Sequence, residues 1–425
     1  MSEINIPYGK RSITYHNKEN IPFNLILPIE NDVAEPQEKK NISNALKNCI
    51  GKNESSLFEK KDVTVAISVN DATRPIPYRL ILPLLLNKLE NANISEENVT
   101  FFIATGTHKG LSKNEIKALL STEIVNKFKI FVHDCDDKEH LTYLGISKLG
   151  TPIYINSEFY SHDIKIVVGH IEPHHFMGFS GGVKSAVIGL GGRETIESNH
   201  KMISDPNTKM GLFYSNPMRK DVENIGAVIG VDLALNVVLN SQKNIIDAIY
   251  GDPYHVMVSG IKSSKKACEI EEKTTFDLVI ASPGGFPKDL NLYQSQKAIT
   301  HACSFLKPNG TVVLVAECID GTGSIAFQEY FKNKVDCSDV IHTFENEKFK
   351  IGPHKAYQLA LQLKKYHIFL LSSLDPEIVK SVFLTPVTSI QESFSLSKGY
   401  LPKNPKIAVI PFATHTMHRI FEIDE

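Results

Sequence analysis

A run of β-branched residues that leads into a glycine-rich loop constrains the fold of this chain most. Residues 164–168 have the sequence IKIVV, which is typical of a buried strand, and residues 169–200 follow as GHIEPHHFMGFSGGVKSAVIGLGGRETIESNH. Gly178, Gly181 and Gly182 permit positive φ angles and a close approach of the backbone to a bound molecule. Because open α/β sheets bind ligands beyond the carboxyl ends of their strands, this loop is predicted to bind one.

A phosphate-binding loop is the first interpretation, because Lys184 and Ser185 follow the glycines at a predicted helix start. The segment GFSGGVKS departs from the Walker A pattern, since Val183 stands where that pattern has the glycine directly before the lysine. A nucleotide-dependent phosphotransferase that uses Lys184 and Ser185 remains an alternative function. It would also need a carboxylate placed for magnesium, which the sequence does not identify.

Two further predicted strands lead into polar loops. Residues 62–69 precede a loop with Asp71 and Arg74, and residues 99–104 precede a loop with His108. Each of these side chains has a structural interpretation, as an Asx-turn, a surface arginine or a loop histidine that forms a hydrogen bond. Their shared position after a strand indicates instead that they contribute to one site.

Alternating strands and helices predict an α/β fold with two Rossmann-like domains. A chain of 425 residues is too long for one hydrophobic core, and the charged run at residues 269–275 has the composition of a linker. We expect domains at residues 1–270 and 276–411, with a tail at residues 412–425 that could return to the first domain. Strands at residues 130–133 and 152–155 are expected to join the first sheet. In the second domain we expect strands at residues 276–281, 311–316, 367–371 and 406–411, and helices at residues 293–305 and 354–363.

Composition excludes several classes of protein. With 42% hydrophobic residues, 22% charged residues and a formal net charge of −2, the chain resembles neither a disordered protein nor one that binds nucleic acid. No apolar run approaches the roughly 20 residues that span a bilayer, and the N-terminus lacks a signal-peptide segment, so we expect a cytoplasmic protein with no membrane partner. The six cysteines are scattered without a C-x-x-C pair, which argues against a disulfide framework or structural zinc.

Four segments together resemble a known family. They are GFSGGVKS with His200 downstream, DATRP at residues 71–75, ATGTHKG at residues 104–110 and YQSQK at residues 293–297. In these segments the chain resembles the nickel-dependent lactate racemase family, and the resemblance in layout covers nearly the whole chain. It implies a racemase or epimerase that inverts C2 of lactate or a related 2-hydroxy acid by reversible hydride transfer.

The resemblance also implies the cofactor and its ligands. A nickel-pincer nucleotide (pyridinium-3-thioamide-5-thiocarboxylic acid mononucleotide) would be attached covalently to Lys184, with His200 as a nickel ligand. Nickel(II) favours imidazole and sulfur ligands, which suits this assignment. His108 and His174 would be the catalytic histidines that exchange the hydroxyl proton. Further cofactor contacts are implied for Asp71, Thr73, Gly178, Ser180, Gly181, Gly182 and Ser185.

Substrate-binding residues follow from the same resemblance. Arg74 is a candidate clamp for the substrate carboxylate, because its planar guanidinium pairs with a carboxylate through two hydrogen bonds. Lys297 would supply a second positive charge, and Tyr293 and Gln294 would bind the hydroxy acid. His175 stands where lactate-acting members carry an apolar aromatic residue. A substrate more polar than lactate therefore stays open.

The resemblance assigns a role to each domain. The first would bind the cofactor and carry out catalysis, and the second would close over the substrate, with the active site in the cleft between them. The implied partners are a small 2-hydroxy acid and the proteins that make the cofactor, while the oligomeric state is left open. A third candidate function, a carrier of nickel or nucleotide, leaves Arg74, Gln294 and Lys297 without a role.

Overall fold

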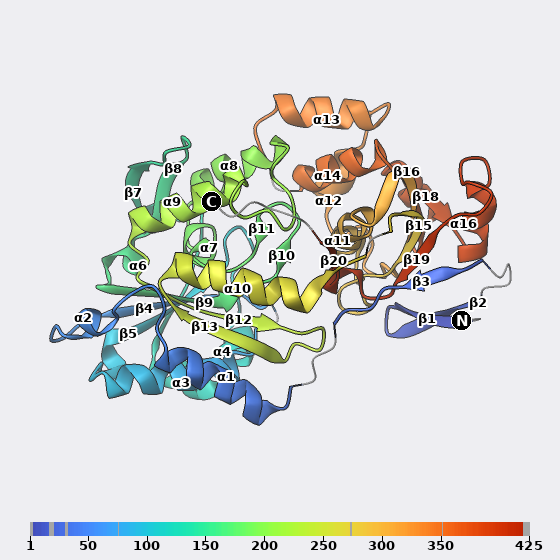
Figure 1. Ribbon diagram of the computed structural model, residues 1–425. Coiled ribbons are helices and arrows are strands. Elements are labelled where there is room, and N and C mark those ends of the chain that lie inside the picture. The colour runs from blue at the N-terminus through green and yellow to red at the C-terminus, as the bar shows by residue number, and fades with distance from the viewer. Residues whose placement is uncertain are drawn as a thin grey trace. The chain divides into compact units, whose positions relative to one another are not determined.

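The computed structural model divides the chain into two compact units (Figure 1). It describes residues 3–16, 21–29, 33–74, 76–272, 274–350 and 352–419. The described residues between 33 and 267 form the central unit. Those from 3 to 29 and from 268 to 419 form the terminal unit. The predicted α/β fold with two domains is confirmed.

The central unit is built on a six-stranded sheet in the order β13-β12-β9-β4-β5-β6. The five strands from β12 to β6 are parallel to one another, and β13 is an antiparallel edge strand. The sequences of these strands are almost continuously apolar, because helices cover both faces of the sheet and bury the side chains on each face. The strands are β4 (Val65–Asn70), β5 (Val99–Ala104), β6 (Lys129–Val132), β9 (Ile164–His170), β12 (Leu233–Leu239) and β13 (Ile245–Gly251).

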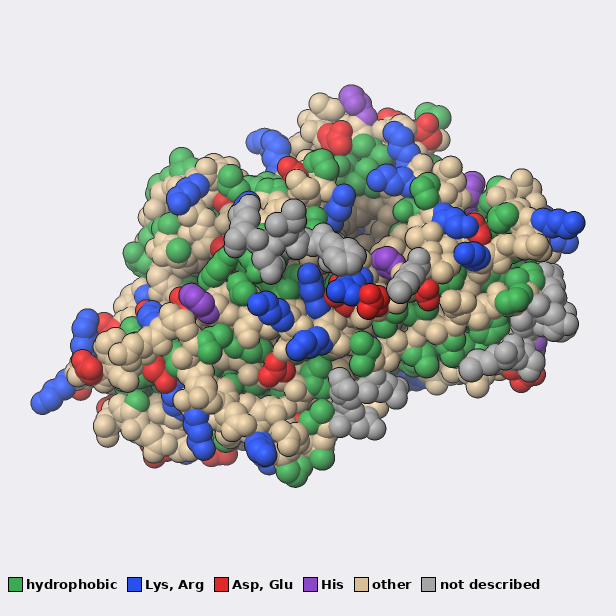
Figure 2. Space-filling model, in the orientation of Figure 1, with side chains coloured by type: hydrophobic (Ala, Val, Ile, Leu, Met, Phe, Trp, Pro, Cys, Tyr) green, Lys and Arg blue, Asp and Glu red, His purple; other side chains and the backbone are tan. Residues whose placement is uncertain are grey.

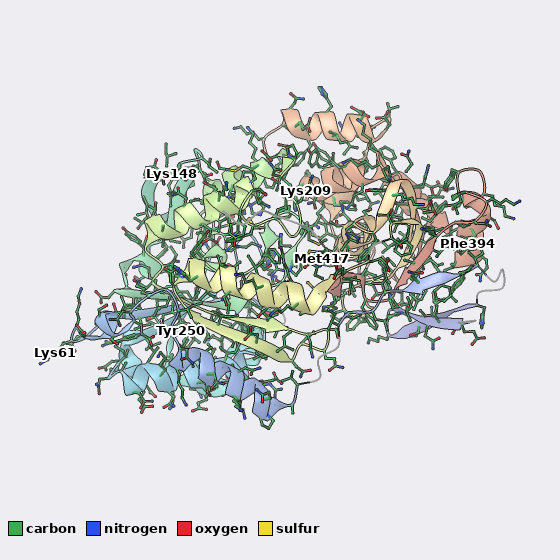
Figure 3. All side chains as sticks on the ribbon, in the orientation of Figure 1. Lys61, Lys148, Lys209, Tyr250, Phe394 and Met417 are labelled. Atoms are coloured by element: carbon green, nitrogen blue, oxygen red, sulfur yellow. The ribbon has the colours of Figure 1, made fainter. Side chains whose placement is uncertain are left out.

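Helices cover both faces of the central sheet. Figure 1 shows α1 and α3 on one face, where they enclose a core with the inner side chains of the strands, and α10 on the other. Tyr250 of β13, labelled in Figure 3, is fully buried in this core. The helices are α1 (Glu35–Lys47), α2 (Ser55–Phe58), α3 (Tyr78–Asn91), α4 (Lys113–Leu120), α5 (Thr122–Lys127), α6 (Ser157–Ser161), α7 (Lys184–Val187), α8 (Arg193–Lys201), α9 (Pro217–Ile229) and α10 (Pro253–Cys268), with 3-10 turns η1 (Glu96–Asn98), η2 (Lys138–His140) and η3 (Met202–Ser204).

Local sequence sets the ends of α9, a helix that supports the candidate site. Pro217 occupies its first position, where the missing amide proton costs nothing. The side chain of Asn216 accepts a hydrogen bond from the amide of Arg219 at 3.2 Å and so caps the helix. Gly230 ends it in the left-handed conformation.

The terminal unit has a second six-stranded sheet, all parallel, in the order β18-β17-β16-β15-β19-β3. One face packs against α11 and α14, and the other against α16, where Phe394 (Figure 3) is buried. The strands are β3 (Phe23–Leu25), β15 (Phe276–Ala281), β16 (Leu306–Val315), β17 (His367–Leu371), β18 (Thr385–Val387) and β19 (Ile407–Ile410). The helices are α11 (Leu292–Cys303), α12 (Ile325–Glu329), α13 (Cys337–Asn346), α14 (Pro353–Leu363), α15 (Pro376–Ser381) and α16 (Ile390–Ser397), with the turn η4 (Ala413–His415). All six elements predicted in the second domain are confirmed, with small shifts of their ends.

The described residues among the first 29 correct the predicted domain boundary. The sequence predicts a first domain of residues 1–270, yet these residues belong to the terminal unit, because β3 pairs with β19 and completes the second sheet. The hairpin of β1 (Glu3–Tyr8) and β2 (Arg11–His16) also docks there. At its turn, the amide of Gly9 donates to the carboxylate of Asp289 at 2.6 Å.

Only the first part of the predicted tail lies within the described residues. There, β20 (Met417–His418) pairs with β14 (Glu269–Ile270) inside the terminal unit. The rest of the tail, residues 420–425, lies outside the described residues. Because β14 covers the start of the charged run at 269–275, that run begins the terminal unit.

The strand predicted at residues 152–155 is also misplaced. It is β8 (Pro152–Asn156), which forms an antiparallel hairpin with β7 (Leu141–Ile146) instead of joining the main sheet. The strand predicted at residues 130–133 does join it, as β6. The sequence of a short strand indicates which of its side chains are buried, but it does not reveal with which other strand it pairs.

Among the described residues, no helix combines the length and apolar character that a membrane crossing requires. Figure 2 shows positive and negative side chains interspersed on the face that it presents, in line with the net charge of −2. The cytoplasmic location expected from the sequence stays a prediction.

Candidate active site

The glycine loop, residues 171–183, leaves the carboxyl end of β9, an inner strand of the central sheet. It first forms a short antiparallel pair, β10 (Pro173–His174) with β11 (Gly178–Phe179), in which His174 lies opposite Gly178. It then enters α7, whose first residue is Lys184. The prediction of a glycine-rich loop between a buried strand and a helix is confirmed.

Two side chains that sequence reasoning missed hold this loop from within the unit. Arg219 of α9 is 0% exposed, pairs with Glu223 and donates from Nη1 to the carbonyl oxygen of Gly181 at 3.1 Å. Asn236 of β12 accepts a hydrogen bond from the amide of Gly182 at 2.6 Å. The spacing of Arg219 and Glu223 on one helix face predicts an ion pair. The same spacing does not predict that Arg219 also binds the glycine loop.

Gly178 is irreplaceable for a steric reason, and this gives a first prediction. Its φ is +73°, and a Cβ atom here would lie 1.7 Å from the carbonyl oxygen of Leu212. We expect Gly178→Ala to lower the free energy of unfolding by more than ~3 kcal/mol, because a backbone shift adds to the left-handed strain of about 1–3 kcal/mol.

Gly230→Ala is the matched control for this prediction. Gly230 has φ +75° but no atom within 4 Å of its would-be Cβ, so only the backbone strain applies. Urea unfolding of both variants measures the difference. Equal losses would show that the contact with Leu212 does not constrain Gly178.

Lys184 and His200 lie close enough to interact electrostatically. His200 is on the last turn of α8, and its ring makes an edge contact with Phe176 at 5.4 Å between ring centroids. Burial, followed by the nearby Lys184 ammonium, lowers the pKa of His200 to about 4. The ring is therefore neutral at physiological pH, which is the form that coordinates a metal.

His174 and His175 are stacked, with centroids 4.5 Å apart and an interplanar angle of 20°. Phe176 contacts both rings edge-on. The amide of Met177 donates to Nδ1 of His174 at 3.1 Å. In the neutral ring the proton of His174 is consequently on Nε2.

Asp71, Thr73 and His108 form a hydrogen-bonded group at the carboxyl ends of β4 and β5. One oxygen of Asp71 lies 2.7 Å from Nδ1 of His108. The other accepts from the amide and hydroxyl of Thr73 at 3.1 and 2.5 Å. Burial alone would raise the pKa of Asp71, but the bonds from His108 and Thr73 outweigh it and lower the pKa. The ionised carboxylate holds the proton of His108 on Nδ1, so that Nε2 can accept one.

The remaining predicted site residues lie on or near these two loops and on α11. Arg74 is half-buried and its amide donates to the Asp71 carbonyl at 3.1 Å. Tyr293, Gln294 and Lys297 occupy the first turns of α11 in the terminal unit. Burial raises the pKa of Tyr293 to about 12, so its phenol stays protonated.

A glycine turn at residues 320–323 supports the start of α11. The amides of Leu292 and Tyr293 donate to the carbonyl oxygens of Gly321 and Thr322 at 3.2 and 3.0 Å. Asn291 caps the helix by accepting from the amide of Gln294 at 3.1 Å. The turn and the cap together fix the direction in which the predicted substrate-binding residues leave the helix.

Other polar groups near these loops are structural. His133 lies 3.0 Å from the carbonyl oxygen of Gly191 through Nε2, and burial lowers its pKa. Asp134, Cys135 and Asp136 lie close together like metal ligands. However, both oxygens of Asp136 accept from the guanidinium of Arg193 at 2.5 and 2.7 Å. That trio is therefore an anchor for α8.

Family models and relatives identify the kind of protein. The lactate racemase N-terminal domain matches residues 8–211, and the lactate racemase C-terminal domain matches residues 271–415. A lactate racemase of Thermoanaerobacterium thermosaccharolyticum is 31% identical over 422 residues, which covers 97% of this chain and 98% of that protein. This chain belongs to the lactate racemase family.

Another relative and one solved structure agree with this family, and a second solved structure shares the fold. A lactate racemase of Lactiplantibacillus plantarum is 28% identical over 418 residues, 97% of this chain and 98% of that protein. The lactate racemase apoprotein of Thermoanaerobacterium thermosaccharolyticum matches with a TM-score of 0.91 at 30% identity, over 98% of this chain and 100% of that one. A Thermotoga maritima protein matches with a TM-score of 0.65 at 14% identity, over 92% and 99%, and shares the fold alone.

The glycine loop of this family member fits the covalent nickel-bearing nucleotide that the family implies. Ser180 and Ser185 are buried, and among the described residues their hydroxyl oxygens have no hydrogen-bond partner. Lys184 stands between them at the start of α7, and His200 is neutral beside it. An amine, a neutral imidazole and two spare hydroxyls suit attachment, metal ligation and hydrogen bonding to a nucleotide.

The structure joins some of the predicted site residues and leaves others as predictions. It brings together Asp71 with His108, Lys184 with His200, and His174 with His175. The roles of these residues in catalysis and binding stay predictions. So does a cleft that brings the residues of α11 to those of the central unit.

Proposed function

We propose that this chain is a racemase that interconverts the enantiomers of a 2-hydroxy acid, with lactate as the reference substrate. Membership of the lactate racemase family supports this activity. The observation that supports the proposal most is the hydrogen bond between the buried carboxylate of Asp71 and Nδ1 of His108. Such a pair presents a basic Nε2 to a substrate hydroxyl, as general acid-base catalysis requires.

We infer that a nickel-pincer nucleotide is held covalently by Lys184, with His200 as a nickel ligand and with Ser180 and Ser185 as hydrogen-bond donors. When bound, this group supplies a hydride acceptor for C2, which ordinary side chains lack. The residues of the chain then have to bind the substrate, orient it and move its hydroxyl proton. Proteins that make and load the cofactor are the proposed partners of the maturing enzyme.

The two proposed catalytic histidines present the same nitrogen, Nε2, in different protonation states. His108 has a free lone pair on Nε2, because its Nδ1 proton is held by Asp71. His174 carries its proton on Nε2 when neutral, because Met177 donates to Nδ1. One ring is set to accept a hydrogen bond from the substrate oxygen and the other to donate one. This difference suits a reaction in which the hydroxyl proton leaves to one group and returns from another.

Two cations are proposed to bind the substrate carboxylate. Arg74 offers a planar guanidinium, and Lys297 of α11 offers an ammonium group. Tyr293 and Gln294 on the same turns would bind the hydroxyl side. These contacts recognise the carboxylate and the hydroxyl group that all 2-hydroxy acids share. They do not determine which substituent on C2, here called the tail, the enzyme prefers.

His175 is the proposed determinant of the tail. We expect His175→Phe to lower kcat/KM for malate at least tenfold relative to lactate, because phenylalanine keeps the stack on His174 but removes both ring nitrogens. A site built to form a hydrogen bond rejects analogues that lack the group far more strongly than a methylene difference allows. Steady-state rates with lactate, malate and a sugar acid measure the ranking. An unchanged ranking would exclude His175 from specificity.

The proposed function is tested on protein produced together with the enzymes that make the cofactor. We expect an intact mass above that of the chain, stoichiometric nickel and racemisation of lactate. With lactate deuterated at C2, the label should remain in the product, whereas exchange with solvent would favour a carbanion route. Nucleotide that binds reversibly with magnesium, without a mass increase, would instead support a phosphotransferase that uses Lys184 and Ser185.

A further inference from the structure

The helix that carries His200 depends on contacts outside itself. Helix α8 has nine residues, and isolated helices of this length are marginal in water. Its first turn is held by the ion pair of Arg193 with Asp136. In the same turn, the hydroxyl of Thr195 donates to the carbonyl of Pro152 at 2.8 Å. The last turn, which bears His200, is held by a different and fully buried group.

That group is centred on Asp221 of α9. Asp221 and Asn199 are both 0% exposed. One carboxylate oxygen of Asp221 accepts from the hydroxyl of Ser147 at 2.5 Å. The other accepts from Thr151 Oγ1 at 2.7 Å and from Asn199 Nδ2 at 2.9 Å. Asn199 Nδ2 also lies 3.1 Å from the carbonyl oxygen of Met218, which fastens α8 to α9.

Helical geometry connects this group to His200. Thr195 and Asn199 are four residues apart and share the face of α8 that is fastened to its neighbours. His200 is about 100° further round, on the face where it meets Phe176 and the Lys184 ammonium. Rotation or displacement of the last turn would therefore move the His200 ring directly.

We propose that Asn199 and Asp221 are positioning residues that aim His200 at the nickel. This rests on the proposed function, because it presumes that His200 ligates the metal. A carboxylate that accepts three hydrogen bonds in a buried site is well suited to fix a helix in one place. Supporting residues around a metal ligand typically contribute 10–100-fold to metal affinity.

Asn199→Ala tests the proposal, with Ser147→Ala as the matched control. Both variants remove one donor from the same carboxylate, but only the first releases α8. Loaded protein is exposed to a chelator, and nickel loss is followed while intact mass reports the adduct on Lys184. We expect Asn199→Ala to lose nickel at least tenfold faster than wild type while it keeps the adduct, and Ser147→Ala to match wild type.

Thermal unfolding of the same samples separates positioning from general stability. Equal nickel loss in Asn199→Ala and Ser147→Ala, or loss that only follows Tm across both, would overturn the proposal. Should Asn199→Ala fail to fold, Asn199→Ser is the second variant: its single hydroxyl proton cannot serve both Asp221 and the Met218 carbonyl, so it should show the same separation of nickel from adduct. If wild type itself carries neither adduct nor nickel, the proposed function is wrong. If all variants retain nickel equally well, only the positioning role of Asn199 and Asp221 is wrong.

Discussion

Lys184→Ala should yield a folded protein that carries no covalently attached nucleotide and does not racemise lactate. Lys184 is half-buried at the first position of a four-residue helix, with a backbone that Asn236 and Arg219 hold through neighbouring residues. Removing its side chain therefore leaves the glycine loop intact. Because alanine has no amine, attachment is impossible and the loss of activity should be complete. Intact mass, nickel content and racemisation of lactate measure the effect on the co-produced protein.

Lys184→Arg is the control for charge. It retains the positive charge beside His200 but offers no amine of the same reach and reactivity. We expect this variant to lack the adduct as well, with a Tm close to that of wild type. An adduct that persists in either variant, or that maps to another lysine, would remove Lys184 from its proposed role.

The positions of the loops could be predicted from the sequence because parallel strands present their carboxyl ends at one edge of a sheet. Strands β4, β5 and β9 are adjacent, so the loops with Asp71, His108 and Lys184 start side by side. The pairing of Asp71 with His108 depends on side-chain rotamers, and the family resemblance implies a separate role for each residue. The structure adds their contact, and with it the tautomer of His108.

Contacts between residues that are far apart in the chain could not be predicted from the sequence. The amide of Gly9 meets Asp289 across 280 residues, and β3 adds to a sheet whose other strands begin at Phe276. No local pattern records such pairing, because any short apolar strand fits many sheet edges. The same holds for Asp221, whose bonds to Ser147 and Asn199 become visible only when the hairpin and two helices are assembled.

Asp71→Asn is expected to lower kcat by about 10²- to 10⁴-fold with little change in stability. The carboxylate now accepts from Nδ1 of His108 and twice from Thr73. An asparagine of the same shape can keep its carbonyl oxygen on Thr73 and place its amide group on His108. An amide donates, so Nδ1 of His108 must accept and the ring proton moves to Nε2. The nitrogen proposed to take the substrate proton is then already protonated.

Thr73→Val separates this effect from a general disturbance of the loop. It removes the hydroxyl bond to Asp71 but leaves the bond between Asp71 and His108, so kcat should fall less than tenfold. Nitrogen-15 NMR of the histidine rings reports the tautomer directly and should show the proton of His108 on Nδ1 in wild type and Thr73→Val, and on Nε2 in Asp71→Asn. If Asp71→Asn shifted the tautomer yet kept wild-type kcat, His108 would not be the base. If kcat fell without a shift, Asp71 would act through another contact, such as the cofactor contact implied by the family resemblance.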